Sequence, residues 1–183
     1  DEARCGLAEG GIPIGSVLVH RGTILGRGHN RRIQQGSAIR HGEMDALENA
    51  GRLPAHVYRE SVLYTTLSPC SMCAGAILLY GIPKVIIGEH DTFMGEEDLL
   101  RSRGVTVEVV HDARRIEMMR RFIAERPGDA HVPEARGMLA NALAGSGQIA
   151  AAAEELRAQA FYNKSFDVKL TQLILFGMLL VEH

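Results

Sequence analysis

Two cysteines at the start of a predicted helix carry the strongest chemical signal in the sequence. Cys70 and Cys73 stand three residues apart in the run SPCSMC, between a strand-like run and a helix-like run. This spacing places both side chains on one face of a helix. The free N–H groups and the dipole at a helix N-terminus stabilise the thiolate, which is the form of cysteine that binds zinc. A redox dithiol would use the same spacing, so the cysteines alone leave the chemistry open.

A histidine and a glutamate earlier in the chain favour zinc. His41, Gly42 and Glu43 open a second predicted helix, which precedes the strand and helix of the cysteines. Helix N-termini in α/β folds lie near the carboxyl ends of the strands, so the two groups should meet there. One histidine and two cysteines leave a fourth zinc position open for water, as a catalytic site requires. Glu43 can then stand beside the metal without binding it and carry protons.

The order of these residues follows the signature of zinc nucleobase deaminases, H-x-E and then P-C-x-x-C. The alternatives are a structural zinc site and a spare dithiol. A structural site normally has four protein ligands. No other histidine shows a pairing that supplies the fourth; these are His20, His29, His56, His90, His111, His131 and His183. Cys5 is expected to be inert. The sequence therefore predicts one catalytic zinc per subunit.

The elements that must position these residues alternate between strand and helix. A hairpin is predicted around Arg21 and Gly22, and helical crossovers imply parallel pairing of the later strands. We expect an α/β fold, a three-layer α-β-α sandwich with a mixed five-stranded sheet. The predicted strands are 16–20, 23–27, 62–67, 84–88 and 105–110, and the predicted helices are 42–51, 69–81, 96–103 and 112–125.

The last third of the chain differs from the rest in composition and in its predicted secondary structure. Residues 127–133 (PGDAHVP) have the composition of a linker, and an alanine-rich, helix-like segment follows them. We therefore predict two domains, a zinc-dependent deaminase domain over 1–127 and an all-helical C-terminal segment over 128–183.

Composition excludes several classes of partner. The formal charge of the 183 residues is −2, which gives no electrostatic footprint for nucleic acid or for an anionic membrane surface. The apolar run 173–181 is shorter than the roughly 20 residues that span a bilayer. Three cysteines do not make a disulfide framework, and no signal-peptide pattern is visible. A cytoplasmic enzyme acting on a small molecule is expected.

Residues 1 to about 127 resemble the fungal-type cytosine deaminases of the cytidine deaminase superfamily. The resemblance rests on runs such as EGGIPIG, LGRGHN, GSAIRHGE and LYTTLSPCSMCAGAILLYGIP. It implies a cytidine deaminase-like fold and hydrolytic deamination of cytosine, or a close analogue, to uracil and ammonia. It also implies pyrimidine salvage and a homodimer, with Glu43 as the proton carrier. Ile77 and Leu78 of the cysteine helix are expected to be core residues, and the resemblance implies that they are also part of the dimer face.

The same resemblance implies a substrate pocket. Asn30 would bond the edge of the pyrimidine, although a turn asparagine that ends the hairpin is the simpler reading. Phe93 would stack on the ring, with core packing as its alternative. Gly42 would offer a backbone N–H. The residues that line the pocket or offer backbone groups would be Ile14, Leu67 and Ser68.

The chain departs from the family pattern after residue 127. The family closes its pocket there with aromatic residues and an acid, whereas this chain continues GDAHVPE and contains no Trp. The segment 170–183 (LTQLILFGMLLVEH) instead resembles a helix of carboxymuconolactone decarboxylase-type proteins. Two alternatives to cytosine deamination therefore stay open. One is deamination of another base, such as guanine or the adenosine of a tRNA, and the other is a non-catalytic zinc-stabilised scaffold.

Overall fold

The structure is a computed structural model that describes residues 1–125, 148 and 150–154. Contacts divide the chain into two compact units, Asp1–Phe122 and Ile123–His183. Within the second unit, residues 150–154 are helical. The predictions for the linker and for the segment 170–183 lie outside the described residues, and the domain boundary at 127 stays a prediction.

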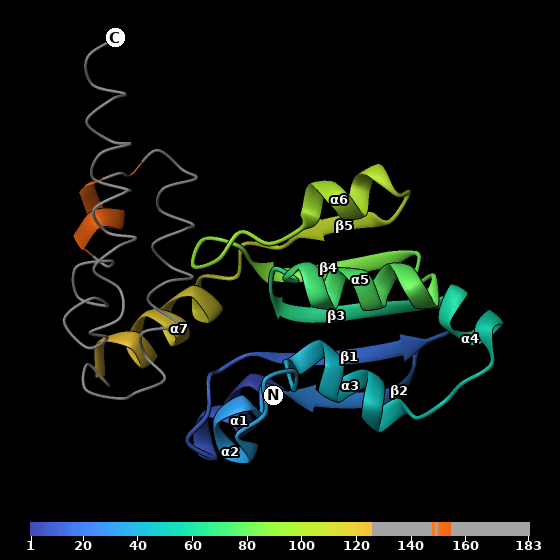
Figure 1. The fold of residues 1–183 in the computed structure, drawn as a ribbon, viewed down its shortest axis with the longest axis horizontal. Coiled ribbons are helices and arrows are strands. Elements are labelled where there is room, and N and C mark those ends of the chain that lie inside the picture. The colour runs from blue at the N-terminus through green and yellow to red at the C-terminus, as the bar shows by residue number, and fades with distance from the viewer. Residues whose placement is uncertain (126–147, 149, 155–183) are drawn as a thin grey trace, which may run out of the picture. The chain divides into compact units, whose positions relative to one another are not determined.

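Five strands form one mixed sheet in the order β2-β1-β3-β4-β5 (Figure 1). Strand β1 is antiparallel to both β2 and β3, whereas β3, β4 and β5 are parallel. As a consequence β2 to β5 all end at the same edge of the sheet. The mixed five-stranded sheet is as predicted. The strands are β1 Gly15–His20, β2 Thr23–His29, β3 Ser61–Leu67, β4 Lys84–Glu89 and β5 Thr106–Val109.

The helices that follow the strands confirm most of the expected pattern. The described part also contains three short helices that we did not predict, α1, α2 and α4. Helix α5 starts two residues later than expected, so Pro69 precedes it and Cys70 is its N-cap. The helices are α1 Glu2–Ala8, α2 Arg32–Gln35, α3 Gly42–Ala50, α4 Ala55–Arg59, α5 Ser71–Tyr80, α6 Glu97–Ser102 and α7 Ala113–Glu125.

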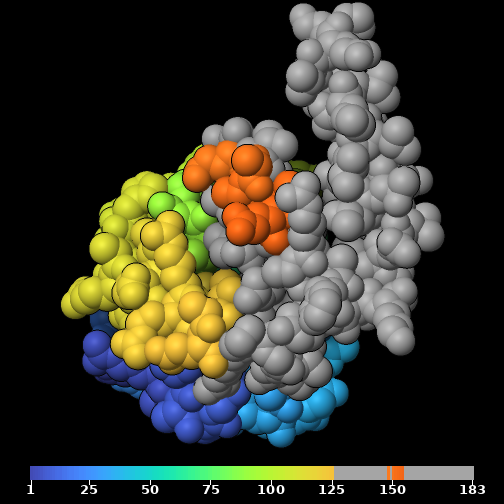
Figure 2. Space-filling view, turned by 90° about the vertical axis from the view of Figure 1, so that its left-hand side faces the viewer, coloured from blue at the N-terminus to red at the C-terminus, as the bar shows by residue number. Residues whose placement is uncertain are grey.

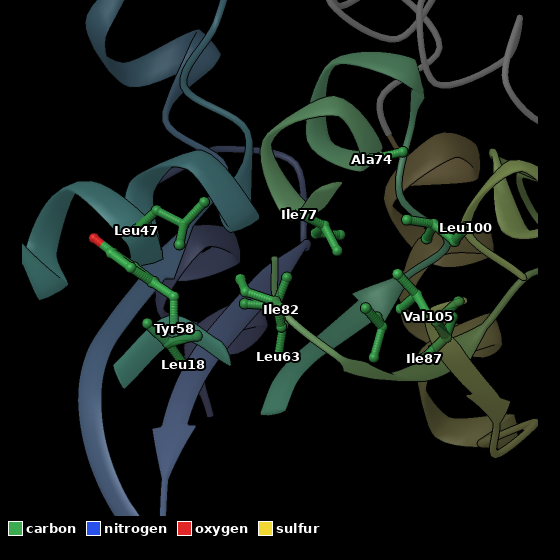
Figure 3. Close-up of a cluster of buried hydrophobic side chains, with 11 residues drawn as sticks. Leu18, Leu47, Tyr58, Leu63, Ala74, Ile77, Ile82, Ile87, Leu100 and Val105 are labelled. Carbon is green, nitrogen blue, oxygen red and sulfur yellow. The ribbon is translucent and has the colours of Figure 1, made fainter. Parts of the chain in front are cut away.

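The core lies between the sheet and the helices α3, α5 and α6 (Figure 3). Alternate residues of the central strands point to this face because side chains alternate along a strand. Leu63 and Val85 are fully buried there, and Ile77 of α5 and Leu47 of α3 pack against them. This packing fixes the N-termini of α3 and α5 over the carboxyl ends of the strands.

Helix α1 lies on the opposite face of the sheet and provides the third layer. A Cβ atom added to Gly15 of β1 would lie 2.4 Å from the backbone nitrogen of Ala3 in α1. On the core side, a Cβ atom on Gly28 of β2 would lie 2.2 Å from the nitrogen of Ala46 in α3. Glycine at these two positions lets helices approach the hairpin from both sides, as the three-layer prediction requires.

The side of the molecule shown in Figure 2 exposes both the N-terminal residues and α7. Residues from the starts of α1 and α7 line one groove together with the outer face of β3, among them Glu2, Tyr64 and Arg115. None of the helices in the described residues is long and apolar enough to cross a membrane.

Candidate active site

Three predicted metal ligands converge at the carboxyl edge of the sheet. His41 is the N-cap of α3, Cys70 is the N-cap of α5 and Cys73 lies in the first turn of α5. The His41 Nδ1 atom is 3.5 Å from the Cys70 Sγ atom and 3.7 Å from the Cys73 Sγ atom, and the two sulfurs are 3.7 Å apart. Tetrahedral zinc with ordinary bond lengths places two sulfurs about 3.8 Å apart and nitrogen about 3.6 Å from sulfur. The three atoms therefore already have the spacing of a zinc site.

The protonation of the two thiols also fits a bound cation. The hydrogen bond with Cys73, together with that from His41, lowers the pKa of Cys70 to about 3 despite partial burial. The same bond, burial and the negative charge of Glu43 raise the pKa of Cys73 far above its usual range. A cation held between the two sulfurs would favour the thiolate form of both cysteines, because coordination deprotonates a thiol.

Glu43 stands beside the three ligands, within the first turn of α3, and is buried. Its Oε1 accepts a hydrogen bond from Thr65 Oγ1 at 3.0 Å, and its Oε2 lies 3.4 Å from Cys73 Sγ. Burial raises the pKa of the Glu43 carboxyl. A raised pKa suits a group that both takes up and releases protons near neutral pH.

Asp45 joins the segments that lead to His41. Its carboxylate is fully buried and accepts hydrogen bonds from the backbone N–H of His29 at 3.1 Å, from Arg31 at 3.1 Å and from Arg40 at 2.8 Å. The bonds connect the end of β2 and the 36–41 loop with α3. Two guanidinium groups offset the cost of burying the carboxylate, so the backbone before His41 is held firmly.

Three of the predicted pocket residues lie together beside His41. The N–H of Asn30 donates to the carbonyl of Ile14 at 2.8 Å. A Cβ atom on Gly42 would lie 3.3 Å from the same carbonyl, so the start of α3 touches this segment. Asn30 Oδ1 accepts from the N–H of Arg32 at 3.1 Å, which is the bond of a turn asparagine. The structure thus shows the turn role of Asn30, and its contact with substrate stays a prediction.

The other three predicted pocket residues lie on the side of the cysteines. Leu67 ends β3 and Ser68 follows it, and both are buried. Ser68 uses its hydroxyl to donate to Glu97 Oε1 at 2.9 Å and to accept from the N–H of Gly95 at 3.1 Å. Phe93 is half-buried in the loop between β4 and α6, which also contains Gly95. Ser68 therefore fastens the loop of Phe93 to the segment that leads to Cys70.

Sequence reasoning missed the residues that hold the site in place. Thr65 points to the core face of β3 and reads as an ordinary strand residue. Asp45 and Glu97 are buried acids in helices, and each is paired with an arginine that is distant in sequence or lies on the next turn. An acid on the apolar side of a predicted helix was the available signal, because such a group is buried only with partners.

The sequence of this chain matches a described family. The model of the cytidine and deoxycytidylate deaminase zinc-binding region matches residues 1–89, a range that contains His41, Glu43, Cys70 and Cys73.

Individual relatives agree with this match. A cytosine deaminase from Candida albicans is 55% identical over 130 residues, which are 70% of this chain and 87% of that protein. A tRNA-specific adenosine deaminase from Streptococcus pyogenes serotype M18 is 43% identical over 101 residues, 54% of this chain and 63% of that protein. A structure solved in a study of A-to-I editing by tRNA:A34 deaminases matches with a TM-score of 0.55 and 27% identity, over 64% of this chain and 92% of that one.

Proposed function

The chain belongs to the cytidine and deoxycytidylate deaminase family, and from this premise we propose that it hydrolyses cytosine, or a close analogue, to uracil and ammonia. The activity is that of a zinc-dependent deaminase. The observation that carries the proposal is the buried Glu43 carboxylate beside three ligand atoms with tetrahedral spacing. The preference for cytosine rests on the 55% identity to the Candida albicans enzyme.

His41, Cys70 and Cys73 would hold the zinc, and the fourth position would be left to water. Bound zinc makes a water molecule nucleophilic at neutral pH. Glu43 would take a proton from the water as its oxygen forms a bond to C4, and would pass this proton to N3 of the ring. It would then carry the second proton of the water to the amino group, so that the C4–N bond breaks and ammonia leaves. Thr65 would hold Oε1 of Glu43 during both transfers, because its hydroxyl donates to that atom in the protein as it stands.

The pyrimidine would lie between two groups of residues. Asn30 would offer its side-chain amide and Gly42 its backbone N–H on the side of α3. The first-turn N–H groups of a helix have no partner within the helix, so Gly42 is suited to this role. On the side of α5, Leu67 and Ser68 would contribute the wall and backbone groups. Ile14 would line the base of the pocket, and Phe93 would stack on the ring.

A different base is the second candidate function. The 43% identity to the Streptococcus pyogenes tRNA-specific adenosine deaminase keeps this possibility open. The net charge of −2 argues against a polynucleotide, because phosphate contacts require lysine and arginine. A zinc-stabilised scaffold fits less well, because it would gain nothing from a buried carboxylate beside the metal.

Ammonia release by the zinc-loaded protein tests the substrate directly. The bases to compare are cytosine, 5-methylcytosine, isocytosine, guanine and adenine, with a tRNA anticodon stem-loop as the polynucleotide. Turnover of cytosine above the others is the expected result. Turnover of a different base alone would contradict the assignment of substrate while leaving the zinc chemistry intact. If a protein that holds one zinc released no ammonia from any of these substrates, the assignment as a deaminase would be contradicted.

We further propose a homodimer that works in cytoplasmic pyrimidine salvage. Ile77 is fully buried in the core, as expected, so it offers no surface to a partner and its place in the expected interface is corrected. The outer side of α5 instead exposes Leu79, of which 80% is accessible, and Tyr80. These two residues line a groove of about 940 Å³ together with residues of α3, of α4 and of the loop between them, including Met44 of α3 and Leu53 of the loop. Light scattering on the native chain would test the dimer.

A further inference from the structure

Two histidines and an aspartate outside the deaminase site lie together at the same edge of the sheet. His90 and Asp91 follow β4, and His111 follows β5. One ligand atom from each of the three side chains lies within 4.8 Å of the other two. The histidines are distant in sequence but close in space, because β4 and β5 are parallel neighbours and end at the same level.

We propose that His90, Asp91 and His111 form a second metal site that takes a divalent ion of the zinc and nickel type. The two imidazole rings meet edge to face, with their centroids 4.8 Å apart. His111 Nδ1 is 3.5 Å from Asp91 Oδ1. Two imidazoles and one carboxylate are the donor set that such borderline ions prefer.

The carboxylate of Glu97 prepares His90 for a metal. Glu97 Oε1 lies 2.8 Å from His90 Nδ1, and the Glu97 side chain is 6% exposed. Ser68 and Arg101 also donate to this carboxylate, so it stays in place. A proton on Nδ1 leaves the lone pair on Nε2. Carboxylates orient metal-binding histidines in the same way in known sites.

The backbone of His111 is fixed in an unusual conformation. Its φ angle is 54°, in the left-handed region that residues other than glycine seldom adopt. The residues on both sides are tied to β4, since the N–H of Val110 donates to Ile87 and that of Asp112 donates to Gly88, each at 2.8 Å. These bonds hold His111 beside the end of β4. The side chains of His111 and Asp91 are 57% and 40% exposed, so an ion can reach them from solvent.

An ion at this site would fasten the β4–α6 loop to the turn between β5 and α7. The same loop carries Phe93, but the proposal does not depend on the identity of the substrate or on turnover. Water would complete the coordination, because the described residues supply three side chains to this site. Binding should therefore be weaker than at the cysteine site, whose thiolates are soft and charged.

Nickel binding to the zinc-loaded chain tests the proposal, because the two metals are counted separately by mass spectrometry. The full chain is used without an affinity tag and with Cys5→Ser, which removes the exposed thiol. We expect one Ni²⁺ per chain in addition to the retained zinc, together with a rise in the unfolding temperature. His111→Asn should weaken nickel binding about tenfold or more. Asn tolerates positive φ, so the backbone is preserved.

Two further variants complete the design. Asp91→Asn should also weaken nickel binding, whereas His56→Asn replaces an exposed histidine of α4 and should leave it unchanged. Equal affinity in wild type, His111→Asn and Asp91→Asn would overturn the proposal. Nickel that binds only by expelling zinc, or no binding at millimolar nickel, would overturn it as well.

Discussion

At the scale of single residues, the proposed chemistry depends on the proton-carrying ability of Glu43. Glu43→Gln keeps the shape of the side chain but cannot exchange protons. We expect full zinc content and a fall in kcat of about 10²- to 10⁴-fold, the usual contribution of a general acid–base group. Metal analysis together with steady-state ammonia release would measure both quantities. A variant with near wild-type turnover would show that Glu43 does not carry the proton.

Thr65 offers a second test at this scale. Its hydroxyl donates to the Glu43 carboxylate, and no observed hydrogen bond joins its side chain to His41, Cys70 or Cys73. Thr65→Val removes the hydroxyl that donates to Glu43 Oε1 and keeps the shape. A hydrogen bond to a charged group contributes about 1.5–3 kcal/mol, so kcat should fall roughly 10- to 100-fold. The matched variant Thr65→Ser retains the hydroxyl and should recover most of the rate. Equal rates in the valine and serine variants would exclude this positioning role.

The sequence predicted the chemical residues better than the residues that support them. His41, Glu43, Cys70 and Cys73 follow a spacing that chemistry constrains, and the structure brings them together. Thr65, Asp45 and Glu97 act through contacts between elements, and no local pattern reports such contacts. For the same reason the proximity of His90 and His111 could not be predicted, since it depends on the register of β4 and β5.

At the scale of elements, the close approach of α3 to the hairpin sets the position of His41. Gly28→Ala would place a Cβ atom 2.2 Å from the backbone nitrogen of Ala46, and backbone cannot yield as a flexible side chain can. We expect the free energy of unfolding to fall by about 1–3 kcal/mol, the usual cost of overpacking, with a lower zinc affinity. Chemical denaturation would measure the loss.

Gly75→Ala is the matched control for this substitution. Gly75 lies in α5, and a Cβ atom there meets nothing within 4 Å. Alanine is the better helix former by about 1 kcal/mol, so this variant should be as stable as wild type or more so. If Gly28→Ala proved equally harmless, α3 would not be held against β2 as the structure shows.

The long, periodic elements were predictable, and the short ones were not. The hairpin follows from Arg21 and Gly22, which both have positive φ and form a tight turn. Gly81, with φ 68°, ends α5 where the sequence suggested. Helices α2 and α4 have four and five residues, too few for a helical period to appear in the sequence. The bonds and packing of the folded chain define them.

At the scale of the whole molecule, the strand order explains why the proposed catalytic and metal-binding residues lie at one edge of the sheet. The crossover from β2 through α3 to β3 passes over β1, so four strands run in one direction and end together. Alternating strands and helices in the sequence predicted the parallel pairs. The place of β1 between β2 and β3 cannot be read from local pattern, because it depends on which strand edges pair.

The buried Glu97 makes the stability of this assembly sensitive to acid. Burial alone would raise the pKa of Glu97, but hydrogen bonds from His90, Ser68 and Arg101 outweigh it and the pKa is lowered from 4.5. A carboxyl whose pKa is lower in the folded protein stabilises the fold above its unfolded pKa, and this contribution is lost as the pH falls through the folded value. Wild type should therefore unfold at a higher temperature than Glu97→Gln at pH 6, and the gap should close toward pH 3.

Thermal unfolding of both proteins between pH 3 and pH 7 would measure this gap. Comparing variants at each pH separates the effect of Glu97 from zinc release, since acid removes zinc from both proteins alike. Asp98→Asn is the matched control, because Asp98 lies on the same helix, is fully exposed and is 3.4 Å from Arg101. It should show no gap at any pH, since exposed ion pairs contribute little. A constant gap between wild type and Glu97→Gln would mean that Glu97 stabilises the edge of the sheet by shape and not by charge.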